Sequence, residues 1–282
     1  TFLVATIIKT DGIVPKYSKK RFSTFSRDLL AFKQWLLDND CKDVCMESTG
    51  KYWVPVWNIL EDSIHVVVAN PKWVSAVKGN KDDNKDSKWI GDLFRMGLVP
   101  GSFVPDRKIR VLREFTRYRY KLISMRSSEK NRFQNAFTVC NSTLDAVLSD
   151  SFGKSATAIE NYLLETDTVN PEYCASLLKG SARKKSAEVM AAVEGFRMSA
   201  GQKERVRIIQ GHFADLDERV ASLDVAINKM TADYEDYLSL LRTIPGVDRN
   251  IAITILSEIG VDMEQFASSK RLCRWAGLTP GN

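Results

Sequence analysis

The sequence predicts an α/β domain followed by a long helical arm and a helical C-terminal segment. In the first hundred residues, short apolar runs alternate with amphipathic stretches, an order typical of an α/β domain with a partly parallel sheet. Apolar residues then recur at spacings of three and four over 107–132 and 202–240, which predicts two long helices. Residues 241–260 have the pattern of a helix–hairpin–helix, with Ile244-Pro-Gly-Val247 as the hairpin.

The N-terminal part begins with a predicted hairpin. Residues 2–8 are apolar and β-branched, Asp11-Gly12 is a turn signal, and residues 13–23 form the second strand. The elements that follow are a helix, a strand, a helix, a strand and a helix, at residues 26–37, 44–47, 54–60, 64–69 and 86–97. This order is compatible with an RNase H-like domain. We therefore predict an α/β domain over 1–104, a helical coiled-coil arm over 105–238 and a C-terminal domain that starts at 239 and continues to 282.

Composition limits the classes of function. A net charge of +6 favours a polyanionic partner, provided that the positive charge is clustered. Five cysteines without a CxxC pair fit a reducing cytoplasm, and the two histidines, neither of them near a cysteine cluster, argue against a structural zinc site. No apolar run has the roughly 18 residues that a membrane span needs. Because the chain begins with Thr1 inside an apolar run, we expect it to be part of a longer protein.

Three carboxylates form a candidate metal site. Glu47 ends a short apolar strand, which places an acid at the edge of a sheet. Asp83 and Asp86 are three residues apart and can share one face of a helix. Such a group favours a hard divalent cation, and Mg²⁺ bound there would act on a phosphodiester. Alternatively, an aspartate here caps the helix while Asp86 is solvated in its first turn. Asp82 with Asp86 fits the helical spacing equally well.

A dense basic helix over 107–132 is the candidate nucleic-acid interface. Its ten cations are set against two acids, Glu114 and Glu129, and Tyr118 and Tyr120 lie among them as possible stacking residues. The ten are Arg107, Lys108, Arg110, Arg113, Arg117, Arg119, Lys121, Arg126, Lys130 and Arg132. The alternative is a solvated surface helix. The pattern does not separate DNA from RNA.

Two smaller features extend this prediction. A second basic cluster over 179–185 adds Lys184 and Lys185 as candidate nucleic-acid contacts. Gly246, in the predicted hairpin, would let the amides of the next helix face a phosphate, although the same sequence fits a simple helix–helix turn. The aromatic residues of the N-terminal part favour core positions over base stacking; they are Tyr52, Trp53, Trp57, Trp73 and Trp89.

Several motifs in the same order resemble one family. They are Glu47-Ser-Thr-Gly-Lys-Tyr-Trp53, Val67-Val-Ala-Asn-Pro71, Lys81-Asp-Asp-Asn-Lys-Asp86, Leu241-Arg-Thr-Ile-Pro-Gly-Val247, Ser257-Glu-Ile-Gly260, Phe266 and Trp275-Ala-Gly-Leu-Thr-Pro-Gly-Asn282. Over nearly its whole length the chain resembles the DEDD transposases of insertion sequences. Relatives of that family include pilin-gene-inverting recombinases and bridge-RNA-guided recombinases.

The resemblance implies a RuvC-like N-terminal domain of RNase H fold, a coiled-coil arm and a C-terminal transposase domain. It matches Glu47, Asp83 and Asp86 to three of the family's four metal-binding acids. The family's first aspartate belongs upstream of Phe2, and its nucleophilic serine belongs after Asn282. The resemblance further implies Mg²⁺, double-stranded donor and target DNA, a structured guide RNA, and homodimers that pair into tetramers in the cytoplasm of a bacterial or archaeal cell.

Three hypotheses follow. The first is a Mg²⁺-dependent transposase or recombinase that cleaves and rejoins DNA under the guidance of an element-encoded bridge RNA. The second is a RuvC-like junction nuclease, which hydrolyses DNA without a covalent intermediate. The third is a non-catalytic scaffold that binds nucleic acid through the basic arm, with an affinity that falls steeply with salt.

Overall fold

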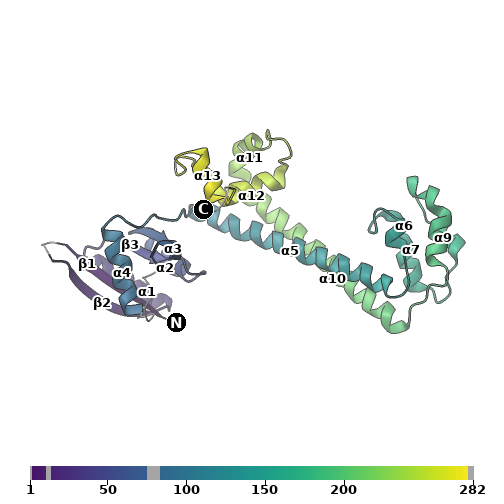
Figure 1. Cartoon of the computed structure of the whole chain (residues 1–282), viewed down its shortest axis with the longest axis horizontal. Helices are drawn as coiled ribbons and strands as arrows, with labels where there is room; N and C mark the ends of the chain where they lie inside the picture. The colour runs from purple at the N-terminus through teal and green to yellow at the C-terminus, as the bar shows by residue number, and fades with distance from the viewer. Residues whose placement is uncertain (1, 11–13, 75–82, 279–282) are drawn as a thin grey trace. The chain divides into compact units, whose positions relative to one another are not determined.

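The computed structural model describes residues 2–10, 14–74 and 83–278 (Figure 1). The chain is mostly helical and divides into two compact units. The first unit runs to Pro105 and also includes the segment from Glu264 onward, and the second unit is Asp106–Met263. The unit boundary at Pro105 lies beside the end of the predicted α/β domain. The predicted C-terminal domain is divided, because residues 239–263 belong to the second unit.

The first unit opens with the predicted antiparallel hairpin. Strands β1 (Phe2–Lys9) and β2 (Lys16–Ser23) pair along their whole length, from Phe2 opposite Ser23 to Lys9 opposite Lys16. The predicted Asp11-Gly12 turn lies outside the described residues. Helix α1 (Ser26–Asp38) follows and buries its apolar face against the hairpin, where Phe22 and Phe32 pack at 5.1 Å between ring centroids.

A parallel pair of strands carries the second part of this unit. Strands β3 (Asp43–Glu47) and β4 (His65–Ala69) are parallel and are joined by helix α2 (Trp53–Leu60). Within the described ranges no ladder joins this pair to the hairpin, so the α/β part contains two two-stranded sheets where the sequence predicts one. Helix α4 (Asp83–Arg95) contacts both β1 and β3 and thereby links the sheets. The short helix α3 (Pro71–Val74) follows β4 directly.

The C-terminal segment of the first unit holds helix α13 (Ser269–Trp275). Three aromatic rings meet there: Phe103 lies 5.5 Å from Phe266 and 6.1 Å from Trp275 between ring centroids, and Phe266 and Trp275 are 5.7 Å apart. All three pairs are edge-on, the geometry that aromatic quadrupoles favour. The trio joins the end of the N-terminal segment to residues from the far end of the chain.

The second unit is built on two long antiparallel helices, α5 (Arg107–Thr138) and α10 (Ala200–Met230), which lie side by side (Figure 1). The predicted basic helix over 107–132 is confirmed within α5. At one end of the pair, Ile109 and Leu112 of α5 pack with Ile227 of α10. The start of α5 is capped by Asp106, whose carboxylate accepts from the backbone N–H groups of Lys108 and Ile109.

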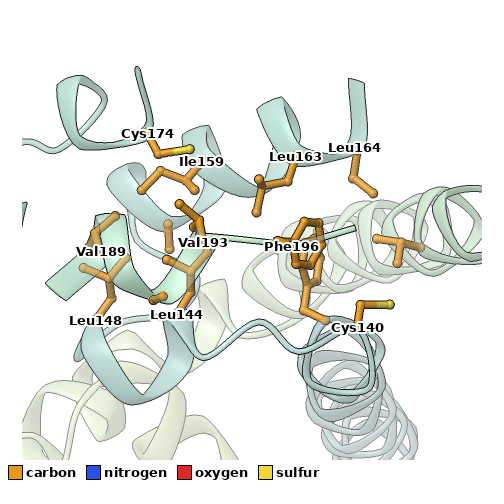
Figure 2. Close-up of a cluster of buried hydrophobic side chains, with 14 of the residues drawn as sticks. Cys140, Leu144, Leu148, Ile159, Leu163, Leu164, Cys174, Val189, Val193 and Phe196 are labelled. Atoms are coloured by element: carbon orange, nitrogen blue, oxygen red, sulfur yellow. The ribbon is translucent and has the colours of Figure 1, made fainter. Parts of the chain in front are cut away.

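A helical lobe lies at the other end of the pair, between α5 and α10. Its elements are α6 (Leu144–Val147), α7 (Lys154–Glu165), α8 (Pro171–Ser176), the 3₁₀ helix η1 (Gly180–Lys185) and α9 (Ser186–Val193). Figure 2 shows Ile159, Val189 and Val193 in its core, all fully buried. Phe133 and Phe137 of α5 and Val206 of α10 belong to the same apolar cluster. The lobe is therefore part of one core with the ends of both long helices.

The predicted helix over 202–240 is confirmed as far as residue 230, and the prediction is wrong in making it continuous beyond that point. Helix α10 ends at Met230, and a 3₁₀ turn, η2 (Ala232–Tyr234), separates it from α11 (Glu235–Leu241). The buried Thr231 hydroxyl donates to the carbonyl of Ile227, so a local hydrogen bond marks the break. Helix α12 (Arg249–Ile259) completes the predicted helix–hairpin–helix. In the described part of the chain, none of the helices combines the length and apolarity of a membrane span.

Candidate active site and nucleic-acid interface

Glu47 lies where the parallel strands end. It is the last residue of β3, opposite Ala69 of β4, and the next backbone N–H, of Ser48, donates to the Ala69 carbonyl at 2.9 Å. The carboxylate is half-buried and accepts a hydrogen bond from the Thr49 hydroxyl. Gly50 then turns the chain at a φ of +52°, a conformation that suits glycine. The strand therefore places the acid at the sheet edge, as predicted, and Thr49 fixes its orientation.

The helix with the other two acids packs close to the hairpin. Thr6 of β1 and Ser87 of α4 share a hydrogen bond of 2.8 Å between their hydroxyls. A Cβ atom added at Gly91 would lie 2.6 Å from the end of the Ile8 side chain, so the helix approaches the strand closely where it has no side chain. Farther along, the Tyr17 hydroxyl donates to Asp92 at 3.0 Å. These contacts hold the second and third turns of α4 against the hairpin.

Asp86 is half-buried in the first turns of this helix. Asp83 is the first residue of α4, three positions earlier, but its side chain lies outside the described part, as does Asp82. Among the described side chains, no three His, Cys, Asp or Glu gather as a metal-ligand group. Glu47 and Asp86 nevertheless suit a hard cation, because both are half-buried oxygen donors and no described cation pairs with either. The assignment of the three acids stays a prediction.

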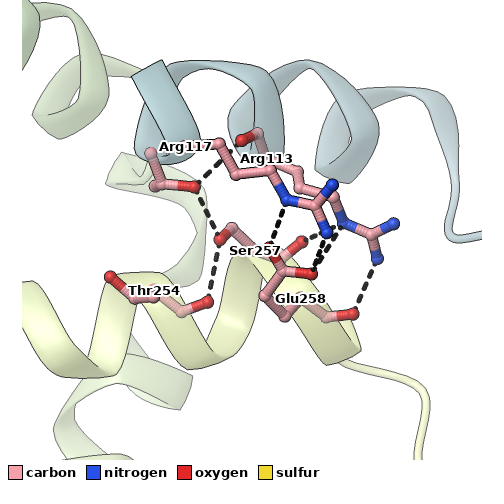
Figure 3. A network of polar contacts seen from close by, with 6 residues as sticks. Arg113, Arg117, Thr254, Ser257 and Glu258 are labelled. Atoms are coloured by element: carbon pink, nitrogen blue, oxygen red, sulfur yellow. Dashed lines mark hydrogen bonds and ion pairs between the residues drawn. The ribbon is translucent and has the colours of Figure 1, made fainter. Parts of the chain in front are cut away.

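The basic helix divides into two sets of cations. The first set is paired inside the second unit. Arg113 donates to the carbonyls of Ser257 and Glu258 at 3.0 and 2.7 Å, and Arg117 donates to both oxygens of the Glu258 carboxylate at 2.8 and 2.9 Å (Figure 3). Burial lowers the pKa of the Arg113 guanidinium, and Glu258 opposes that shift. These two arginines attach the end of α12 to α5.

Other members of the paired set face α10 and the lobe. Arg119 pairs with Asp224, and Arg126 pairs with Asp217 at 2.7 Å. Arg132 pairs with Glu129 on its own helix. The Lys130 ammonium lies over the Phe152 ring at 4.5 Å from its centroid, within cation–π range. Sequence spacing gives no signal for these partners, because most of them lie about a hundred residues farther along the chain.

The second set of cations is exposed. Arg107, Lys108 and Lys121 point to solvent without a described ion-pair partner, and Tyr118 and Tyr120 are exposed beside them. Arg110 is half-buried. In the lobe, Lys184 is exposed, whereas the Lys185 ammonium donates to the Val147 carbonyl at 2.6 Å and so stabilises the fold.

The hairpin of the helix–hairpin–helix is exposed at residues 244–246. Gly246 has a φ of +83°, which favours glycine there. Asp248 caps α12, and its carboxylate accepts from the Ile251 backbone N–H at 2.8 Å. A carboxylate at a helix N-terminus occupies an amide that an anion would need. The predicted phosphate contact at Gly246 would therefore be made by the exposed hairpin and not by free amides of α12.

The prediction of core positions for the aromatic residues is wrong for three of the five. Trp53 and Trp57 are partly buried and pack edge-on at 5.9 Å. In contrast, Tyr52, Trp73 and Trp89 are 70%, 58% and 38% exposed. The core of this unit is already filled by Phe22, Phe32, Leu60 and their neighbours. Periodicity gives no signal at Tyr52, which precedes a helix, or at Trp73, whose helix α3 has only four residues.

An α/β unit with acids at a strand end and a helix with exposed cations are typical of proteins that process nucleic acid, and two family comparisons identify the class of this protein as transposase. Residues 2–141 match a DEDD transposase family of IS110 elements, described as Transposase. Residues 238–282 match the family described as Transposase IS116/IS110/IS902 family. The chain belongs to the IS110 family of DEDD transposases. No curated protein sequence matches the chain.

Proposed function

We propose that this transposase cleaves and rejoins DNA in a Mg²⁺-dependent reaction at the carboxyl edge of β3 and β4. The observation that supports it is the position of Glu47, a half-buried acid at the end of a parallel strand, with the helix of Asp86 packed against that strand. The α/β part would then be a RuvC-like domain of RNase H fold. Family membership supports DNA as the substrate.

In this proposal Glu47, Asp83 and Asp86 would hold the metal. Mg²⁺ bound by carboxylates polarises a phosphodiester and stabilises its leaving oxygen. The Thr49 hydroxyl holds one oxygen of Glu47 and leaves the other as a ligand atom. The nucleophile would be a serine of the family's C-terminal domain, in a segment that is not among these 282 residues. Exposed cations of α5 and Lys184 would bind the phosphate backbone without reading sequence.

The partners proposed on the same basis are donor and target DNA, an element-encoded bridge RNA that selects them by base pairing, and further copies of the chain in a dimer that pairs into a tetramer. The site of action would be the cytoplasm. A discrete structured RNA that copurifies with the complete protein would support guidance. Heterogeneous RNA would contradict it.

Substitution of the acids tests the reaction. In the complete protein, Glu47→Gln and Asp86→Asn should each abolish strand exchange, an expected loss on the order of a hundred-fold or more, because each removes a charged metal ligand. Nucleic-acid affinity should change little. Asp62→Asn is the matched control, since Asp62 is an exposed acid of the same unit, in the turn before β4. Full activity in both site variants would refute the assignment.

The chemistry has a separate test. Denaturation of a reaction with labelled DNA should leave a covalent protein–DNA adduct if a serine attacks the phosphate. Metal-dependent cleavage without an adduct would instead support a junction nuclease.

A further inference from the structure

Three exposed aromatic side chains accompany the candidate acids along the chain. Tyr52 is five residues after Glu47, Trp73 is four residues after Ala69, and Trp89 is three residues after Asp86. Their side chains are 70%, 58% and 38% exposed. Exposure of large rings is costly, because burial of an aromatic side chain removes about 150–250 Å² from water. Large exposed apolar groups that cluster therefore mark binding surfaces.

The topology of the first unit brings Tyr52 and Trp73 to one edge, and the helix that carries Trp89 contacts the strand that ends there. Strands β3 and β4 are parallel, with Glu47 opposite Ala69, so the segments that leave both strands start at the same edge of the sheet. Tyr52 lies in the segment after β3, behind the Gly50 turn, and Trp73 lies in α3, directly after β4. Trp89 and Asp86 are one helical turn apart on α4, which contacts β3.

An exposed lysine directly precedes two of the rings and the acid one turn before the third. Lys51 precedes Tyr52, Lys72 precedes Trp73, and Lys85 precedes Asp86. All three lysines are exposed and have no described ion-pair partner. Lysine is depleted in the cores of protein–protein interfaces. Rings interleaved with cations are instead typical of surfaces that bind single-stranded nucleic acid, where rings stack on bases and cations follow the phosphates.

We propose that Tyr52, Trp73 and Trp89 form an aromatic rim that stacks on unpaired bases of the nucleic-acid strand held at the Glu47–Asp86 edge. The inference rests on the proposed function and adds to it the kind of substrate that the edge accepts, a strand whose bases are locally unpaired. The lysines bind its backbone beside the acids. The rim is tolerant of sequence, because every base has a face on which a ring can stack.

The test uses the complete protein and a DNA hairpin that carries one 2-aminopurine, in the presence of EDTA to prevent cleavage. This adenine analogue loses fluorescence when it stacks. In one probe it is unpaired in the loop, and in the other it is paired in the stem. We expect wild-type protein to change the emission of the loop probe and to leave that of the stem probe nearly unchanged.

Ring removal should weaken binding of the loop probe only. Tyr52→Ala and Trp73→Ala should each reduce its affinity by about five- to a hundred-fold. Trp73→Leu keeps an apolar side chain and should lose as much, whereas Trp73→Phe keeps a ring and should stay within about threefold of wild type. Leu37→Ala is the control, because Leu37 is an exposed apolar residue of α1 near the opposite edge, before β3 begins.

Two results would overturn the proposal. In the first, both alanine variants bind both probes as wild type does. In the second, binding is unchanged but the variants sediment as smaller assemblies, which would assign the rim to contacts between protein chains. Failure of the proposed function looks different. Loop-specific stacking without metal-dependent cleavage would contradict the proposed function and leave the aromatic rim supported. Metal-dependent cleavage together with wild-type binding in the ring variants would contradict only the aromatic rim.

Discussion

The two units of the protein treat their charged residues differently. In the α/β unit the described charges of the candidate metal site are few, and its acids Glu47 and Asp86 have no described cationic partner. In the helical unit the charges are many, and half of the ten cations of the basic helix pair with acids of the same unit. The density of charge in the sequence therefore does not measure how much of it is available to a partner.

The reason lies in what surrounds each charge. A long helix that packs on two others has several faces, and cations on the inner faces need acids to offset their desolvation. Arg113 is only 19% exposed and faces the end of α12, whereas Arg117, one turn later, is 63% exposed. The described partner of Glu47, at its strand end, is instead the neutral Thr49 hydroxyl. The comparison predicts that exposed cations without a described partner bind nucleic acid and that half-buried paired cations such as Arg113 stabilise the fold.

The largest expected effect is on binding. The triple variant Arg107→Gln, Lys108→Gln, Lys121→Gln should lose on the order of a hundred-fold in affinity at about 0.1 M salt, and its log–log salt slope should fall by about three, because three phosphate contacts are removed. Titration of labelled duplex at several salt concentrations measures both quantities. The thermal midpoint should not change.

The control for this variant removes a charge pair without altering the net charge. Arg119→Gln with Asp224→Asn should leave the salt slope as in wild type. If the triple variant also kept the wild-type slope, the exposed face of α5 would be only a solvated surface. If the control changed the slope instead, the division into paired and exposed cations would be wrong.

The next effect is on stability. Arg113→Ala should lower the free energy of unfolding by about 2–4 kcal/mol, because two carbonyls and the half-buried Glu258 carboxylate lose a charged donor. Arg117→Ala should lower it by less than about 1 kcal/mol, since that pair is exposed. Urea unfolding of the complete protein measures both. Equal losses would contradict the role given to Arg113.

A smaller effect depends on pH. Burial, and to a lesser extent Asp145, raises the pKa of Glu160 in the lobe to about 8. The folded state then keeps a proton that the unfolded state releases above its ordinary pKa of 4.5, so the free energy of unfolding should fall as pH rises from about 4.5 to about 8. Glu160→Gln should remove this trend and be more stable than wild type at pH 8 by at least about 1 kcal/mol. If the free energies of unfolding of the two proteins changed with pH in parallel, burial would not disfavour the ionised form of Glu160.

Much of the fold was accessible from local sequence. The basic helix, the hairpin strands and the helix–hairpin–helix follow from apolar spacing and turn residues, whose signals are local. The break at Thr231 did not follow from the sequence. Nothing in the local sequence shows whether a threonine hydroxyl will donate to a carbonyl of its own helix. The separation of the strands into two sheets did not follow either, because which strands pair is decided by contacts between distant segments, such as those of α4 with both β1 and β3.

The candidate sites differ in the same way. The end of a strand at Glu47 was predictable, because the apolar run stops there and small residues follow. The partners of Arg113 and Arg117 were not, because Ser257 and Glu258 lie more than a hundred residues away and nothing local marks them. The exposure of Trp73 was also not predictable. Whether an apolar residue is buried depends on which other segments fill the core, and here other residues fill it.

The length of α5 sets a scale for the nucleic acid that the helical unit can engage. Its 32 residues span about 48 Å at 1.5 Å per residue. Arg107 stands at one end, and the lobe that carries Lys184 packs at the other. A helical turn of B-DNA is about 34–36 Å, so a duplex that reaches both ends needs about 14 base pairs. Shorter duplexes would touch one end only, and a plot of affinity against duplex length should therefore rise in two steps.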